Sequence, residues 1–202
     1  MNEKFARSIE TLENFRLPRY GDLPELELYM DQVISTVEKY LSALKVGDKS
    51  ILTPSMVNNY VKNGVIPPPE KKRYTRDHLA EIIIICTLKQ TVELSDVALI
   101  MKKGVERFGT EAAFDSYVSL YEKTMSRLVG DARLSSGDAT DPDGEYKTII
   151  DSAVLSGTSR IIVENALASV EKGEICDSAP QKPRKKKQKS DGGEEISILP
   201  VI

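Results

Sequence analysis

Four polar side chains in the stretch from residue 55 to residue 62 share one face if that stretch is helical. They stand at positions i, i+3, i+4 and i+7, as Ser55, Asn58, Asn59 and Lys62. Side-chain amides can pair with the edge of adenine in a DNA major groove, and a lysine can reach phosphate or guanine. An ordinary solvated helix face has the same spacing, so this pattern by itself leaves both interpretations open.

A basic cluster follows after three consecutive prolines. We expect it to form a short β wing whose cations contact the DNA backbone, which positions a protein without reading sequence. Tyr74, inside the cluster, can hydrogen-bond phosphate, although a tyrosine entering a helix is more often a hydrophobic staple. The residues that we predict to contact DNA are Ser55, Asn58, Asn59, Tyr60, Lys62, Lys71, Lys72, Arg73, Tyr74 and Arg76.

The charge is distributed unevenly along a chain whose net charge is -3. Residues 54–103 carry eight basic and five acidic side chains, whereas residues 104–181 carry seven basic and fourteen acidic ones. A local positive excess is what phosphate contacts need. A second excess lies in the tail KPRKKKQK at residues 182–189. This tail is either a nonspecific DNA-binding arm or a solubilising disordered segment.

Caps and apolar periodicity predict an all-α chain with a small β wing. Thr53 and Pro54 begin the polar helix and Gly64 ends it, while Thr75 caps an isoleucine-rich central core helix. The other predicted helices cover residues 24–44, 95–101, 110–129 and 146–172, the last interrupted at Gly157.

These elements divide the chain into four parts. They are an N-terminal segment (1–22), a winged helix-turn-helix domain (23–104), a C-terminal helical region (105–175) and a disordered basic tail (176–202). Isoleucine and valine pairs at residues 149–154 and 161–170 would form the seam of a homodimer or pack on the core of the same chain.

Residues 53–103 resemble the winged-helix domain of MerR-type transcriptional regulators. In those domains a recognition helix ends in glycine before an apolar pair, and a wing leads into an aromatic-Ser/Thr dipeptide, a long apolar helix and a helix that opens near Leu-Ser. The matching positions are Gly64, Val65-Ile66, Tyr74-Thr75 and Leu94-Ser95. The resemblance implies DNA binding, transcription regulation and a homodimer that spans two half-sites.

The chain more closely resembles a bacterial family classed as a domain of unknown function, over roughly residues 15–110. That resemblance implies the fold and a DNA-binding ancestry, without an established activity. Three features depart from typical MerR proteins: the long helix before the recognition helix, the short wing, and Asn59-Tyr60 in place of an arginine-tyrosine pair. There is also no separate ligand-binding barrel, so no effector site is recognisable.

Little in the sequence favours an enzyme, a cofactor or a metal. His78 is the single histidine, and we expect it on the surface without a nucleophile beside it. Cys86, within IIIICTL, is expected to be a buried thiol. No apolar run has transmembrane length and no signal peptide is present, so we expect a cytoplasmic protein that does not enter membranes.

Two functions remain as hypotheses. The first is a regulator whose partners are double-stranded DNA and a second copy of the chain. The alternative is a non-catalytic protein-interaction module on a winged-helix scaffold that no longer reads DNA. The steep salt dependence of DNA binding would distinguish them.

Overall fold

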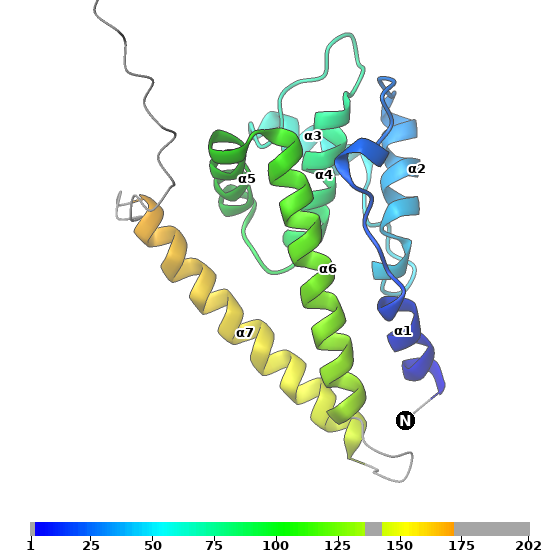
Figure 1. Cartoon of the computed structure of the whole chain (residues 1–202). Coiled ribbons are helices and arrows are strands. Elements are labelled where there is room, and N and C mark those ends of the chain that lie inside the picture. The colour runs from blue at the N-terminus through cyan, green and yellow to red at the C-terminus, as the bar shows by residue number, and fades with distance from the viewer. Residues whose placement is uncertain (1–2, 136–142, 172–202) are drawn as a thin grey trace, which may run out of the picture.

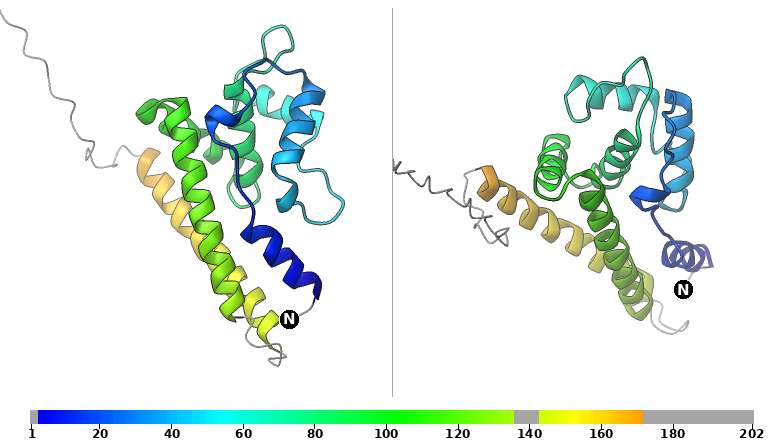
Figure 2. Two further views of the ribbon diagram at one scale, coloured as in Figure 1. Left: turned by 45° about the vertical axis from the view of Figure 1, so that its right-hand side comes forward. Right: turned by 45° about the horizontal axis from the view of Figure 1, so that its top comes forward.

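The described residues of the computed structural model, 3–135 and 143–171, fold mainly into helices (Figures 1 and 2). In chain order these are α1 (Glu3–Glu13), the 3-10 turn η1 (Tyr20–Asp22), α2 (Met30–Tyr40), the 3-10 turn η2 (Ser42–Leu44), α3 (Pro54–Lys62), α4 (Arg76–Leu88), α5 (Leu94–Phe108), α6 (Thr110–Ser135) and α7 (Gly144–Glu171). Within the described ranges, β pairing is limited to two isolated bridges. The predicted helical class is confirmed, whereas the predicted β wing is not seen.

Helix α4 is the centre of the core, as its isoleucine run predicts. Ile82, Ile83 and Ile85 are fully buried, and so is Cys86, which is a free thiol. One continuous cluster of buried side chains extends from Phe15, before η1, to Val118 in α6. The segment before residue 23 and the first half of α6 therefore share the core of the region between them.

Helix α3 begins and ends where its caps predict. The Thr53 hydroxyl accepts a hydrogen bond from the Met56 N–H at 3.3 Å, and Pro54 occupies the first turn, where its missing N–H is not needed. After the helix, Gly64 adopts a φ of +67°, in the left-handed region that glycine enters without a steric cost. Val57 packs inward from the middle of the helix.

Helix α2 is shorter than predicted, because it begins at Met30 rather than at Pro24. The residues before it are extended, and Leu28 exchanges backbone hydrogen bonds with Tyr74 at 2.9 and 2.8 Å. The Gln32 side chain then accepts from the Tyr29 N–H at 2.9 Å and starts the helix. A pairing between residues far apart in the chain thus overrides the local helix-start signal at Pro24.

Helix α5 is longer than predicted and continues through Gly104 to Phe108. A Cβ at Gly104 would lie 3.5 Å from the Cβ of Ala113, so this glycine marks a close approach of α5 to α6. The turn between the two helices falls at Gly109, which has a φ of +81°. The predicted domain boundary after residue 104 therefore lies inside a helix.

The two longest helices, α6 and α7, diverge from the end at which they meet (Figures 1 and 2). Helix α6 extends beyond the predicted end at Val129, and α7 passes through Gly157 without ending. The N-terminal segment is fixed to α6, since Arg19 donates to Glu122 at 2.9 Å and the Tyr20 N–H donates to Asp115 at 2.7 Å. The predicted disordered tail lies outside the described residues.

No helix in the described ranges combines the length and the apolar character needed to cross a bilayer.

Candidate nucleic-acid interface

The outer face of α3 carries the four polar residues that its periodicity places there. Ser55, Asn58, Asn59 and Lys62 are all exposed, while Val57 and Tyr60 on the opposite side are buried. The Asn59 side-chain oxygen accepts a hydrogen bond from the Asn63 amide at 3.0 Å, which leaves the Asn59 amide hydrogens free to donate. The exposed surface of α3 can therefore offer both donors and acceptors to a ligand.

A tight turn occupies the position of the predicted β wing. The Arg73 N–H donates to the Glu70 carbonyl at 2.8 Å, and the two central residues, Lys71 and Lys72, have φ values of +47° and +65°. Positive φ at both central positions is the combination found in a type I′ turn, which usually contains Asn-Gly. Two lysines instead adopt this backbone conformation, and their side chains are exposed. We call residues 70–73 the basic turn.

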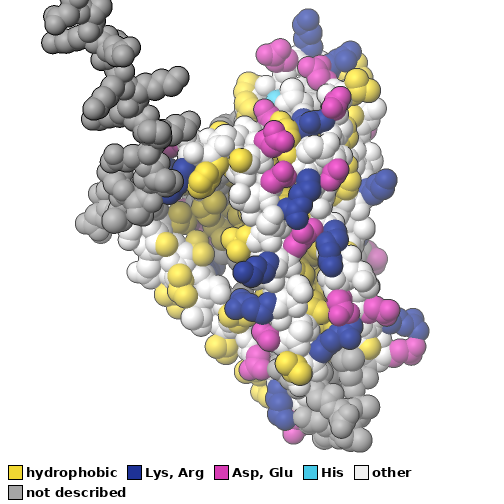
Figure 3. All heavy atoms as spheres, viewed as in Figure 1, with side chains coloured by type: hydrophobic (Ala, Val, Ile, Leu, Met, Phe, Trp, Pro, Cys, Tyr) yellow, Lys and Arg dark blue, Asp and Glu magenta, His cyan; other side chains and the backbone are white. Residues whose placement is uncertain are grey.

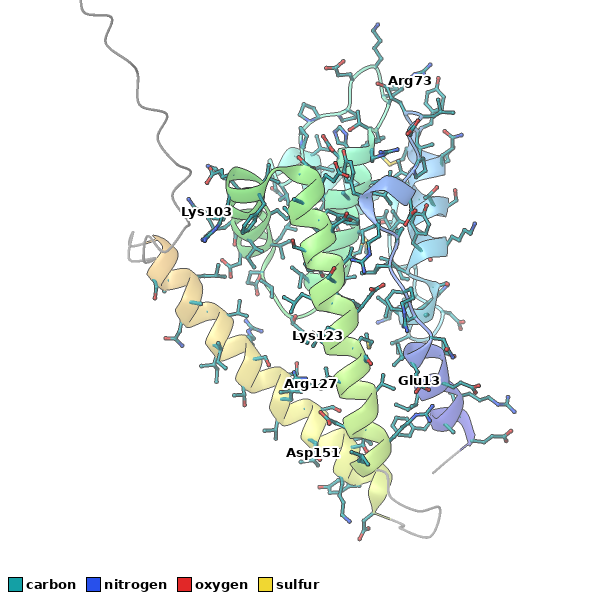
Figure 4. The ribbon with its side chains drawn as sticks, in the orientation of Figure 1. Glu13, Arg73, Lys103, Lys123, Arg127 and Asp151 are labelled. Carbon is teal, nitrogen blue, oxygen red and sulfur yellow. The ribbon has the colours of Figure 1, made fainter. Side chains whose placement is uncertain are left out.

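The cations of α3 and of the basic turn have no acidic partner among the residues that the structure describes. In the part of the chain that the structure describes, no carboxylate lies within 4.0 Å of Lys62, Lys71 or Lys72. The Arg73 guanidinium lies 5.1 Å from the centre of the Tyr29 ring, a cation–π contact that leaves its charge uncompensated. Figure 4 shows Arg73 at the end of the molecule, away from Lys123 and Arg127 along α6.

Arg76 does not belong to this group of uncompensated cations. Its guanidinium forms an ion pair with Glu25 at 3.3 Å and lies 5.3 Å from the centre of the Tyr20 ring. The side chain is largely buried by these contacts, so Arg76 fastens the extended segment before α2 to the start of α4. This pairing makes Arg76 less available to phosphate than the lysines of the basic turn, and its contact with DNA stays a prediction.

The two tyrosines of the predicted DNA-contacting set are core residues. Tyr60 and Tyr74 are 4% and 3% exposed, because α3 and the residues after the basic turn direct both rings inward. Burial raises the pKa of each phenol. The Tyr60 hydroxyl accepts from the Lys89 ammonium at 3.1 Å, and the Tyr74 ring packs edge-on against His78. Neither phenol is available to a phosphate.

His78 is buried rather than exposed, contrary to expectation. Its Nδ1 atom accepts from the Thr75 N–H at 3.1 Å, and therefore Nε2 carries the proton and donates to the Pro67 carbonyl at 3.2 Å. The ring thus joins the chain just before the basic turn to the chain just after it. This role is structural and gives the turn a fixed base.

Two side chains that the sequence analysis did not select hold α3 in place. Lys89, at the end of α4, donates to the Ile51 carbonyl at 2.9 Å as well as to Tyr60. Glu38, in α2, accepts from the N–H groups of Ile51 and Leu52 at 2.7 and 3.2 Å. The loop that leads into α3 is therefore fastened to two other helices by charge-assisted hydrogen bonds. No local pattern signals these contacts, since the partners are 13 or more residues apart.

Acidic and apolar residues lie next to the basic turn, so the surface there is mixed (Figure 3). Leu26 is 81% exposed, and Glu25 and Glu27 are exposed on either side of it. Within the described ranges, no cluster of three or more His, Cys, Asp or Glu side chains is arranged to hold a metal ion.

Residues 18–124 match the model of one protein family, whose description is Domain of unknown function (DUF1836). The matched region begins before η1 and ends within α6, so it covers α2 to α5 and the basic turn. Neither the curated proteins nor the solved structures contain a match to the chain.

Proposed function

Since the chain belongs to the DUF1836 family, whose description assigns no activity, we propose from its own residues that it is a DNA-binding regulator. In this proposal the protein is cytoplasmic and binds double-stranded DNA through a MerR-like helix-turn-helix. Helix α3 enters the major groove, and the basic turn replaces a β wing on the neighbouring backbone.

One observation carries the proposal: the polar outer face of α3 and the cations of the basic turn are exposed, and no carboxylate in the described ranges compensates those cations. A lysine already paired with a carboxylate gains little from phosphate, whereas an uncompensated one releases counterions when it binds DNA. The scaffold beneath is rigid, because Lys89, Glu38 and His78 fix the loop before α3 and the base of the turn. Such fixed geometry favours a defined docking pose.

Within this surface the residues have different roles. Asn58 and Asn59, at the middle of the exposed face, are the groove-reading residues, because a side-chain amide can donate to and accept from adenine. Lys62, Lys71, Lys72 and Arg73 contact phosphate and set the position of α3.

A fluorescence anisotropy titration with labelled duplex DNA at several salt concentrations tests the proposal. Lys71→Glu combined with Lys72→Glu should lower the affinity roughly tenfold or more near 0.1 M salt and flatten the salt dependence. The matched control is Lys39→Glu combined with Lys123→Glu, which changes the net charge equally at exposed positions of α2 and α6 (Figure 4 labels Lys123). Equal losses of DNA affinity in both variants would mean that the effect comes from net charge alone, and would contradict the proposed interface.

A second variant tests the groove-reading role. Asn58→Ala combined with Asn59→Ala should remove the preference for one sequence over another while nonspecific binding persists. Binding sites selected from a random duplex library by wild type and variant give the comparison. An equal loss of affinity on all sequences would contradict base reading by these amides.

We also propose that the protein acts as a homodimer through α7. This helix is about 42 Å long and leaves large apolar side chains exposed along its length, among them Ile149, Val154, Ile161 and Ile162. It diverges from α6 and leaves an open groove of about 500 Å³ between the two helices, next to the apolar surface seen in Figure 3. A second copy is the occupant that we favour, because pairing would cover α7 and place two α3 helices on one duplex.

Light scattering during size-exclusion chromatography tests this dimer. Ile162→Glu should produce a monomer, because a two-fold interface receives the buried charge twice. Leu120→Glu on α6 is the control, since Leu120 and Ile162 are 64% and 63% exposed. A wild-type protein that is monomeric at all concentrations would exclude the dimer.

The alternative, a protein-interaction module, is supported by the exposed Leu26 and its acidic neighbours. Apolar exposure flanked by acids is typical of a protein-docking surface rather than of a surface that faces phosphate. A folded protein that retains no DNA even at low salt would favour this function.

A further inference from the structure

An apolar pocket that is partly open to solvent lies between α4, α5 and α6. It has a volume of about 100 Å³ and is lined by apolar side chains that include Ile84, Met101 and Phe114. An engineered apolar cavity of about 150 Å³ takes up benzene. The space can therefore accept a small ring or a branched alkyl group with slight adjustment of its walls.

One side chain that bears a carboxyl group contributes to this apolar lining. Among the described residues that surround the space, Glu81 in α4 is the only acidic or basic one. Its Oε2 atom is buried and has no hydrogen-bond partner. A buried polar atom without a partner carries a desolvation cost that a ligand with a matching donor would relieve.

The groups near Glu81 do not supply that donor. Asp77, one turn earlier in α4, is also an acid, and α5 contributes only uncharged residues to the lining. From α6, the Tyr117 hydroxyl is engaged by the Thr87 hydroxyl at 2.6 Å. Burial, aided by Asp77, raises the pKa of the Glu81 carboxyl to about 7. Among the described residues, the ionised carboxylate therefore has no counter-charge.

We propose that this space is a binding site for a small apolar amine, whose ammonium group pairs with Glu81 while its hydrocarbon part fills the space between α4, α5 and α6. An ammonium supplies both the missing hydrogen-bond donor and the missing positive charge, and the apolar lining selects a hydrocarbon body. The site is independent of the proposed DNA interface, and its occupation can be measured without DNA.

Thermal unfolding with added isobutylamine, cyclopentylamine or benzylamine tests the site. At least one of these amines should raise the Tm of the wild-type protein in proportion to the logarithm of its concentration. The corresponding neutral alcohols should have little effect, because they lack the charge. No Tm increase with any of the three amines at millimolar concentration would overturn the proposal.

Two variants assign the binding to Glu81. Glu81→Gln keeps the shape of the side chain and removes a buried charge, so it should fold and should bind the amine at least tenfold more weakly. Glu111→Gln, at an exposed carboxyl on α6, should leave the affinity unchanged. Because the amine pairs with the ionised carboxylate, wild-type affinity should rise roughly tenfold between pH 6 and pH 8, and this rise should be absent in Glu81→Gln. Equal amine affinity in wild type and Glu81→Gln would also overturn the proposal.

Discussion

The basic turn should show opposite effects of one substitution on stability and on DNA binding. Lys71 and Lys72 occupy two consecutive positions of positive φ, +47° and +65°, where Asn-Gly is the favoured pair. The variant Lys71→Asn with Lys72→Gly should therefore relieve backbone strain. It also removes two exposed cations that have no carboxylate partner in the described part of the chain. If those cations served folding rather than binding, the variant would not combine a higher stability with a weaker affinity for DNA.

The size of each effect follows from the geometry. A residue other than glycine in the left-handed region costs about 1–2 kcal/mol of stability. The introduced glycine offsets roughly 0.5–1 kcal/mol of the gain, because it makes the unfolded chain more flexible and so raises the entropy lost on folding. The net gain is about 1 kcal/mol, which corresponds to a rise in Tm of roughly 2–4 °C for a protein of this size. On DNA, the loss of two phosphate contacts should reduce the slope of log K against log[salt] by about 1.8.

Calorimetry and anisotropy titrations over a range of salt concentrations measure the two effects on the same preparations. Lys71→Arg with Lys72→Arg is the matched control, because it keeps both the strain and the charge and should change neither quantity. A variant that is less stable than wild type would refute the account of the strained turn. A salt dependence that is unchanged while stability rises would refute the contact of these lysines with phosphate.

Three further predictions concern stability. Lys89→Met should lower the free energy of unfolding by about 2 kcal/mol in urea titrations, because the Ile51 carbonyl and the Tyr60 hydroxyl lose their charged donor; Lys39→Met at an exposed site should have no such effect. Gly104→Ala should stabilise the protein by about 1 kcal/mol, since a Cβ there meets Ala113 at an ordinary contact distance, and destabilisation would mean that α5 and α6 cannot accommodate a methyl group. The raised pKa of Glu81, about 7, favours the protonated carboxyl in the folded state, so stability should fall as pH rises from about 4.5 to 7. In Glu81→Gln the fall in the free energy of unfolding over this pH range should be smaller by roughly 2–3 kcal/mol. Parallel pH profiles of stability for the two proteins would contradict the assignment of this fall to Glu81.

The sequence is most informative where a structural signal is local. Thr53 with Pro54 defines the start of α3, and the isoleucine run of α4 identifies the central helix, because caps and 3.6-residue periodicity act within a few residues. The signal fails where distant segments interact. Pro24 resembles a helix start, but the pairing of Leu28 with Tyr74 keeps that segment extended.

The sequence likewise identifies only part of the candidate interface. Helical periodicity identifies Asn58 and Asn59 as outward-facing without any knowledge of the fold, although the same reasoning does not identify Lys89, whose partners lie in another helix and in a loop. The Glu81 site has no sequence signature, because it depends on three helices that meet around one acidic side chain.

The cations near the basic turn show most clearly what each level determines. The sequence by itself specifies that Lys71, Lys72, Arg73 and Arg76 are close together, and therefore that this region is basic. Only the tertiary structure distinguishes them, since Arg76 reaches Glu25, which is far away in the chain, whereas the two lysines project from a tight turn without an acidic partner in the described residues. The physical reason is that charge is a property of each residue, while its compensation depends on which distant residues the fold brings within a few ångströms.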